Sequence, residues 1–127
     1  MHLEAERFEW SKKTFPESTP LGSLCKLREE VKEIDENIKN EVKDPSEYAD
    51  ALMCLFDVVQ RSGNSVSEVL DMARVFTNFS FFKLDRYVDD LEIYILSQNP
   101  PPDAPASVLI ALYELAESEG ITASDIH

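Results

Sequence analysis

The sequence feature that most restricts the fold is a pair of long helical segments joined by only a few residues. The first follows Thr19 and Pro20, a capping residue and a proline suited to the first helical position, and is expected to run to about Asn40. Its apolar side chains recur every three or four residues and form one stripe: Leu24, Leu27, Val31, Ile34 and Ile38. This spacing predicts an amphipathic helix.

The second helical segment opens at the sequence DPSE. Asp44 can cap it, Pro45 suits its first turn, and Glu47 stands at the capping-box position. The segment is apolar around most of its circumference and should end at Gly63, so we expect it to be the most buried helix. Because the connection between the two segments is so short, they must form an antiparallel hairpin.

The rest of the chain also indicates helices. Residues 65 to 68 form a second capping box that opens a third helix, residues 88 to 96 are a candidate short helix, and residues 106 to 119 precede Gly120 as a final helix. The proline-rich stretch 97 to 105 reads as an extended connector. With three glycines and little strand-type alternation, we predict an all-α antiparallel bundle of about four to five helices. At 127 residues the chain is expected to form one domain, residues 1 to 127, with its core within residues 5 to 87.

The charge balance limits the partners. Twenty-five acidic and twelve basic residues give a net charge of −13, which repels phosphate backbones and anionic lipids, so we expect no nucleic-acid and no membrane partner. The longest apolar run is interrupted by Asp50 and Asp57 and is too short for a membrane span. A signal-peptide pattern is missing, and Cys25 and Cys54 lack metal-type spacing, which together favour a cytoplasmic location.

Four carboxylates fall on the two helices of the predicted hairpin. Glu30 and Glu33 lie one turn apart beside the apolar stripe, and Glu47 and Asp50 lie one turn apart on the next helix. Residues whose numbers have the same sum lie level in an antiparallel hairpin, and both 30 with 50 and 33 with 47 sum to 80. The four acids should therefore converge in one layer, where they would repel one another unless a cation lies between them.

Oxygen ligands of this kind select hard divalent cations, Mg²⁺ first and Mn²⁺ as a substitute. Other interpretations stay open: Glu47 alone could be a capping-box residue, and the glutamates from 29 to 36 could be a solvated face paired with nearby lysines. Asp50 is harder to explain structurally, because it interrupts the most apolar helix. The two histidines stand at positions 2 and 127, which argues against a di-iron site of the Glu-x-x-His type.

The acid pattern resembles a known family. The stretch from Glu29 to Glu33, thirteen further residues, and then the stretch from Glu47 to Asp50 are similar to the EExxE…ExxD signature of the MazG-like all-α nucleoside triphosphate pyrophosphohydrolases. The upstream sequence FEWSKKTFP resembles the phage and bacterial dATP/dGTP diphosphohydrolase branch. The resemblance covers about residues 5 to 80.

The resemblance implies an activity and a set of site residues. The activity is Mg²⁺-dependent hydrolysis between the α- and β-phosphates of dGTP or dATP, giving a nucleoside monophosphate and pyrophosphate and controlling the nucleotide pool. The implied metal ligands, for two or more ions, are the following: Glu30, Glu33, Glu47 and Asp50. Glu30 and Glu33 would be the catalytic carboxylates, with Glu30 orienting or deprotonating the attacking water.

Substrate contacts also follow from the resemblance. Trp10 and Phe15 are candidate walls of the base pocket, although both could equally be core residues. Arg74 and Asn78 match a Lys-x-x-x-Asn pair of the family, where the basic residue meets phosphate. Two positions depart from the pattern, because a family histidine is Lys26 here and a family arginine is Phe81. Other basic residues could replace the lost phosphate contacts: Lys12, Lys13, Lys83 or Arg86.

The resemblance further implies a homodimer or homotetramer that completes the bundle, in the cytoplasm of a bacterial cell or of an infected host. The phenylalanines between residues 76 and 82 are too many for one small core and suggest an oligomer interface. Two alternatives to a purine-specific enzyme stay open at this point. One is a pyrimidine dNTP pyrophosphohydrolase acting on dUTP or dCTP, and the other is a non-enzymatic acidic module that binds a basic partner protein.

Overall fold

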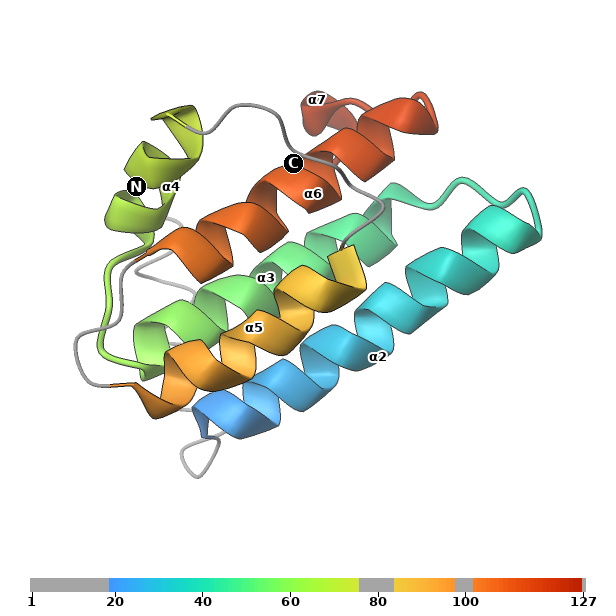
Figure 1. The fold of residues 1–127 in the computed structure, drawn as a ribbon. Helices are drawn as coiled ribbons and strands as arrows, with labels where there is room; N and C mark the ends of the chain where they lie inside the picture. Colours follow the sequence, from blue (N-terminus) through green and yellow to red (C-terminus); the bar gives the residue numbers. More distant parts are fainter. Residues whose placement is uncertain (1–18, 76–83, 98–101, 127) are drawn as a thin grey trace.

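A computed structural model describes residues 19–75, 84–97 and 102–126 of the chain. These residues form six helices and no strand, which confirms the all-α prediction. The helices, labelled as in Figure 1, are as follows: α2 (Pro20–Lys39), α3 (Pro45–Arg61), α4 (Val66–Val75), α5 (Leu84–Leu96), α6 (Asp103–Ser118) and α7 (Ala123–Ile126).

The predicted hairpin is present with the predicted ends. Thr19 caps α2 by accepting a hydrogen bond of 3.0 Å from the amide of Gly22, and Pro20 occupies the first turn. Asp44 caps α3 in the same way through the amide of Ser46. The two helices run antiparallel and contact each other along their length (Figure 1).

Four of the helices close a ring around one core. α2 contacts α3, α3 contacts α6, α6 contacts α5, and α5 contacts α2. The course of the chain in Figure 1 shows that neighbouring helices of this ring run in opposite directions. The shorter helices α4 and α7 lie at the edge, where α4 packs on α6 and α7 packs on α3.

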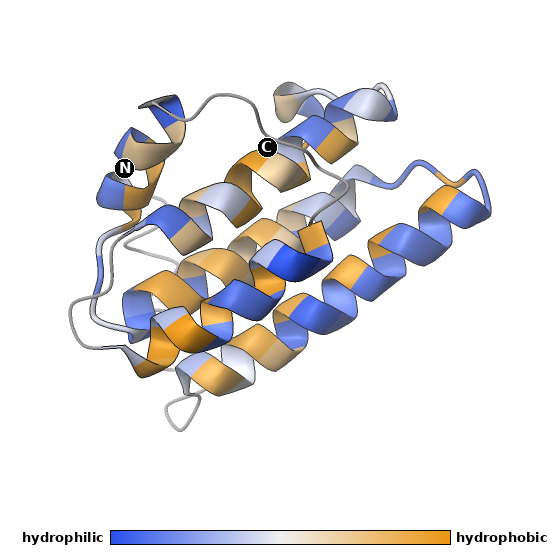
Figure 2. Ribbon diagram, in the orientation of Figure 1, coloured by the Kyte–Doolittle hydropathy of each residue, from blue (hydrophilic) through white to orange (hydrophobic). Residues whose placement is uncertain are grey.

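Apolar side chains from all four ring helices fill the centre. Leu27 of α2, Leu55 of α3, Leu91 of α5 and Val108 of α6 are each 0% exposed. Figure 2 shows hydrophobic and hydrophilic residues alternating along α2, as its spacing predicted. Burial of one such leucine or valine side chain contributes about 1.5–3 kcal/mol to folding. α6 buries seven residues against six in α3, so the prediction that α3 would be the most buried helix was wrong.

Three helices end in the same hydrogen-bond pattern. After α2 the amide of Val42 donates to the carbonyl of Asn37 across 2.8 Å, and the corresponding bonds follow α3 and α6. This ending needs a left-handed residue just past the helix. Gly63 and Gly120 fill that position after α3 and α6, whereas Glu41 fills it after α2 with φ of 56°.

Two helices begin earlier than the sequence predicted. α5 begins at Leu84 rather than Val88, because Leu84 continues the buried side of this helix. α6 begins at Asp103, so the connector predicted to end at residue 105 is shorter. Pro105 lies in the first turn of α6, where a missing amide hydrogen leaves no bond unmade.

The short helix α7 was missed. Its signal is a capping box, in which the amide of Asp125 donates to the Thr122 hydroxyl and the Asp125 carboxylate accepts from the Thr122 amide. Across the described ranges, no helix is both long and apolar enough to cross a membrane.

Candidate metal centre

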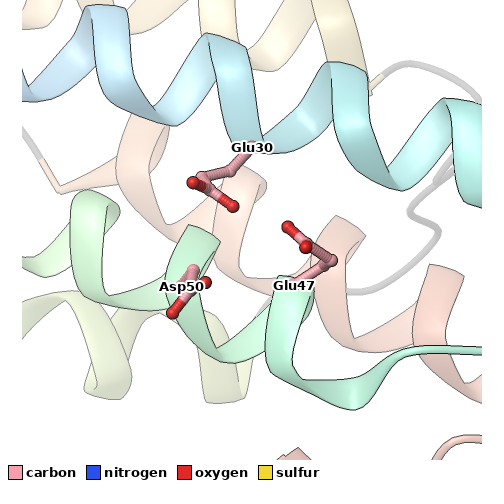
Figure 3. Close-up of side chains that lie close together, drawn as sticks. All are labelled: Glu30, Glu47 and Asp50. Atoms are coloured by element: carbon pink, nitrogen blue, oxygen red, sulfur yellow. The ribbon is translucent and has the colours of Figure 1, made fainter.

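Three carboxylates meet between α2 and α3. Glu30 projects from α2, and Glu47 and Asp50 project from successive turns of α3 (Figure 3). One oxygen from each residue can be chosen so that all three atoms lie within 4.8 Å of one another. Atoms at these separations can surround one ion, so the structure brings together three of the four predicted ligands.

The local structure of α3 directs Glu47 toward α2. Asp44 caps the helix with its own carboxylate, which accepts from the amide of Ser46 at 3.0 Å and from the Ser46 hydroxyl at 2.6 Å. Glu47 therefore extends across the hairpin, and its Oε2 has no hydrogen-bond partner within the described part of the chain. The capping-box interpretation of Glu47 is less favourable than the ligand interpretation.

Partial burial makes the charges of Glu30 and Glu47 unfavourable without a cation, whereas Asp50 is exposed. The Oε2 atoms of Glu30 and Glu47 are both shielded from solvent and lack a hydrogen-bond partner among the described residues. Burial raises the pKa of Glu30, and the nearby carboxylates of Glu33 and Asp50 raise it further. The pKa of Glu47 is also raised, mainly by the adjacent Glu30 carboxyl group.

Glu33 lies beside this group rather than within it. Its side chain is exposed, and its carboxyl group lies close enough to that of Glu47 for the contact to raise the pKa of Glu33. The predicted level pair of Glu33 and Glu47 is therefore in contact. The group of three nevertheless excludes Glu33, because Glu30 rather than Glu33 approaches both acids of α3.

Cys54 and Lys26 extend the same face of the hairpin. Burial raises the pKa of the Cys54 thiol to about 12, with further contributions from Glu30 and Asp57 and an opposing one from Lys26. The sequence placed Lys26 near the acids of α2 as a lysine at helical spacing, but not opposite Cys54 of α3. The register rule predicts this pairing, because 26 and 54 also sum to 80.

The predicted substrate residues are mostly outside the described ranges, which do not include Trp10, Phe15 and Asn78. Arg74 is described on α4, where it is exposed. Its guanidinium lies 3.4 Å from the Asp71 carboxylate one turn earlier on the same helix. Such an exposed pair is weak, so Arg74 remains available for other contacts.

The donor set indicates which ion could bind. Glu30, Glu47 and Asp50 offer only carboxylate oxygens, which suit Mg²⁺ or Mn²⁺ rather than the nitrogen and sulfur sites of zinc. The two buried oxygens without partners fit this interpretation, because a cation would satisfy both.

Comparison with known proteins identifies the family. A family model described as dATP/dGTP pyrophosphohydrolase matches residues 3–80, more than half of the chain. The chain belongs to the dATP/dGTP pyrophosphohydrolase family. This pyrophosphohydrolase is therefore an enzyme that hydrolyses acid anhydrides. No curated protein and no solved structure matches the chain. The match includes α2, α3 and α4 and ends before α5, α6 and α7.

Proposed function

We propose that the protein hydrolyses dGTP and dATP between the α- and β-phosphates in a reaction that depends on Mg²⁺, with Mn²⁺ as a substitute. The observation that carries this proposal is the group of Glu30, Glu47 and Asp50, with two buried oxygens that have no partner in the described ranges. The membership in a dATP/dGTP pyrophosphohydrolase family supports the substrate class.

Glu30, Glu47 and Asp50 would hold the first ion, and Glu33 beside Glu47 would supply an oxygen for a second. When bound, the ions would neutralise charge on the triphosphate and make a water molecule more acidic. The protein needs this contribution, because its own charge of −13 repels a triphosphate.

Glu30 is the proposed base of the reaction, with Glu33 next to it as the second catalytic carboxylate. Glu30 has two carboxylate oxygens, so one can bind a cation while the other accepts a hydrogen bond from the attacking water. As the water oxygen forms its bond to the α-phosphorus, the bond from that phosphorus to the bridging oxygen breaks. Pyrophosphate leaves with the electron pair, and the water proton passes through Glu30 to solvent.

The substrate contacts are part of the same proposal. Trp10 and Phe15 would stack against the purine, and Arg74 and Asn78 would contact the nucleotide. Control of the nucleotide pool, in a bacterium or during phage infection, is the proposed role. We further propose a homodimer or homotetramer formed from one domain per chain, for which light scattering of the purified protein gives a direct test.

The deciding experiment measures pyrophosphate and monophosphate released from each dNTP and rNTP, with Mg²⁺, with Mn²⁺ and with EDTA. The variants are Glu47→Gln and Asp50→Asn, with Glu29→Gln as the matched control, because Glu29 is an exposed acid next to Glu30. We expect turnover of dGTP and dATP that requires metal, is lost in both site variants and persists in the control.

Other outcomes would contradict the proposal. Faster turnover of dUTP or dCTP than of dGTP or dATP would mean that the preferred substrate is a pyrimidine nucleotide, although the proposed chemistry would be the same. Hydrolysis that persists in EDTA, or in either site variant, would show that the reaction does not require the metal centre. Lack of turnover of any nucleotide by folded, metal-loaded protein would favour an acidic module that binds a basic protein.

A further inference from the structure

A buried tyrosine links the metal-binding end of α3 to the end of α6. Tyr48 directly follows Glu47, and its side chain is 2% exposed. Its hydroxyl donates a hydrogen bond to the carboxylate of Glu119, the residue that caps the C-terminus of α6. Glu119 lies 71 positions later in the chain, beyond residue 80, where the family match ends.

A second contact joins the same two regions. Gly120 follows Glu119 with φ of 80°, and a Cβ placed on it would lie 3.5 Å from the Nζ atom of Lys43, which directly precedes the cap of α3. Ile121 is buried next to this turn, and α7 contacts α3. The C-terminal segment therefore packs against the start of α3.

The start of α3 needs such support. The first turn of a helix lacks half of its backbone hydrogen bonds and frays most easily. Glu47 lies in this turn, and the direction of its carboxylate depends on how the turn is rotated about the helix axis. The ring of Tyr48 is buried and its hydroxyl is bonded, and both oppose rotation of the turn away from the position in which Glu47 faces Glu30.

We propose that Tyr48 and Glu119 are positioning residues of the metal centre: their hydrogen bond holds the first turn of α3 so that Glu47 reaches the ion. The inference rests on the proposed metal site at Glu30, Glu47 and Asp50. On this proposal, the region after residue 80 positions a metal-ligating side chain, Glu47, without contacting the substrate.

The test compares two buried tyrosines, Tyr48 of α3 and Tyr94 of α5. Tyr48→Phe removes the hydroxyl that bonds Glu119 and keeps the ring. Tyr94→Phe is the matched control, because Tyr94 is 4% exposed and its hydroxyl bonds Asn64, beyond the opposite end of α3, at 2.7 Å. Mn²⁺ affinity is measured by calorimetry at a temperature where every variant is folded, and thermal stability is measured in parallel.

We expect both variants to lower the melting temperature and only Tyr48→Phe to weaken Mn²⁺ binding, by about 5-fold. The loss should be smaller than the 10- to 100-fold that follows removal of a direct partner of a metal ligand, because the bond acts through the helix. Glu119→Ala should weaken Mn²⁺ binding similarly, and the double variant should lose no more than the larger single loss. Glu117→Ala, which changes an exposed acid of the same turn, should leave the affinity unchanged.

Three outcomes would overturn the inference. Equal Mn²⁺ affinity in Tyr48→Phe and wild type would show that the hydrogen bond stabilises the fold and does not position Glu47. Equal losses in Tyr48→Phe and Tyr94→Phe would show a general effect of lower stability. A wild-type protein that binds no Mn²⁺ would overturn the metal site, and with it this inference, whereas the first two outcomes leave the metal site intact.

Discussion

Glu30 of α2 and Glu47 of α3 face each other across the hairpin, and each has one shielded carboxylate oxygen without a hydrogen-bond partner in the described residues. An unsatisfied buried oxygen destabilises a fold by about 1–3 kcal/mol, and more when it is charged. Without metal, these two carboxylates are therefore unfavourable neighbours when both are charged. A divalent cation would offset the repulsion between them, so stability and metal binding should be coupled.

Glu30→Gln should separate these two effects. The substitution removes one of the facing charges, so the metal-free protein should become more stable by about 1 kcal/mol. It also removes a proposed ligand, so Mn²⁺ should no longer raise the melting temperature. Thermal denaturation with and without Mn²⁺ checks both outcomes, and Glu29→Gln should behave as wild type. An undiminished rise with Mn²⁺ in Glu30→Gln would contradict the ligand assignment.

Lys26→Gln should weaken binding of the triphosphate more than binding of the metal. Lys26 lies one turn before Glu30 on α2 and acts on the Cys54 thiol from the same face as the acids. One charge-assisted contact to phosphate is worth about 1.5–3 kcal/mol, so we expect KM for dGTP to rise about 10-fold with little change in kcat.

Inhibition by dGMP, which lacks the distal phosphates, should be unaffected by Lys26→Gln. The matched control is Lys32→Gln, because Lys32 lines a separate cavity of about 360 Å³ with residues of α2 and α5. A similar rise of KM in both variants would indicate a general charge effect instead of a contact.

Asp35→Asn should raise stability in a manner that depends on pH. Partial burial raises the pKa of Asp35 above its ordinary value of 3.8, and Asp85 across the α2–α5 contact adds to the rise. A carboxyl whose pKa is higher in the folded than in the unfolded state favours folding below the unfolded pKa. This contribution is lost as the pH rises through the folded pKa.

The Asp35→Asn variant should therefore exceed wild type at pH 7 by about 0.5 kcal/mol, the scale of one charge pair near a surface, with the gain shrinking toward pH 4. Urea denaturation at several pH values measures this, with Asp90→Asn on the exposed side of α5 as control. A gain that is independent of pH would mean that the charge of Asp35 is not its cause.

Glu41→Gly should stabilise the hairpin. Glu41 takes φ of 56° in the turn after α2, whereas glycine fills the same position after α3 and α6. A left-handed conformation is unfavourable for a side-chain-bearing residue by about 1–2 kcal/mol, part of which is offset by the freedom of glycine in the unfolded chain. We expect a net gain of about 0.5–1 kcal/mol by chemical denaturation. Gly63→Ala should lose a similar amount, and a destabilised Glu41→Gly would show that the Glu41 side chain contributes more than its backbone.

The parts of the fold that the sequence predicted correctly depend on neighbours within a few positions. Thr19, Asp44 and Gly63 mark helix ends through bonds to residues two to five places away, so local chemistry is enough to find them. The apolar stripe of α2 and the antiparallel hairpin follow from the same short-range signals. The start of α6 was misplaced because proline reads as a helix breaker, although the first turn accepts it.

For the candidate metal centre, the sequence predicted the height along the hairpin at which the acids lie, but not which of them face one another. Equal sums of residue numbers place the acids of α2 and α3 at similar heights, but they say nothing about rotation of each helix about its axis. That rotation decides that Glu30, and not Glu33, joins both acids of α3. It is set by the burial of Tyr48 and by its bond to Glu119, a contact across 71 positions that no local pattern reveals.

The short connection between α2 and α3 also bears on how the chain folds. All three acids of the group lie between residues 30 and 50, so closing the loop that joins them costs little entropy, and the contacts are of low sequence separation. We therefore expect the hairpin that carries the candidate metal centre to form early, before α5 and α6 complete the ring. A cation bound at that stage would lower the folding barrier. The metal would then increase the rate of refolding, and not only decrease the rate of unfolding.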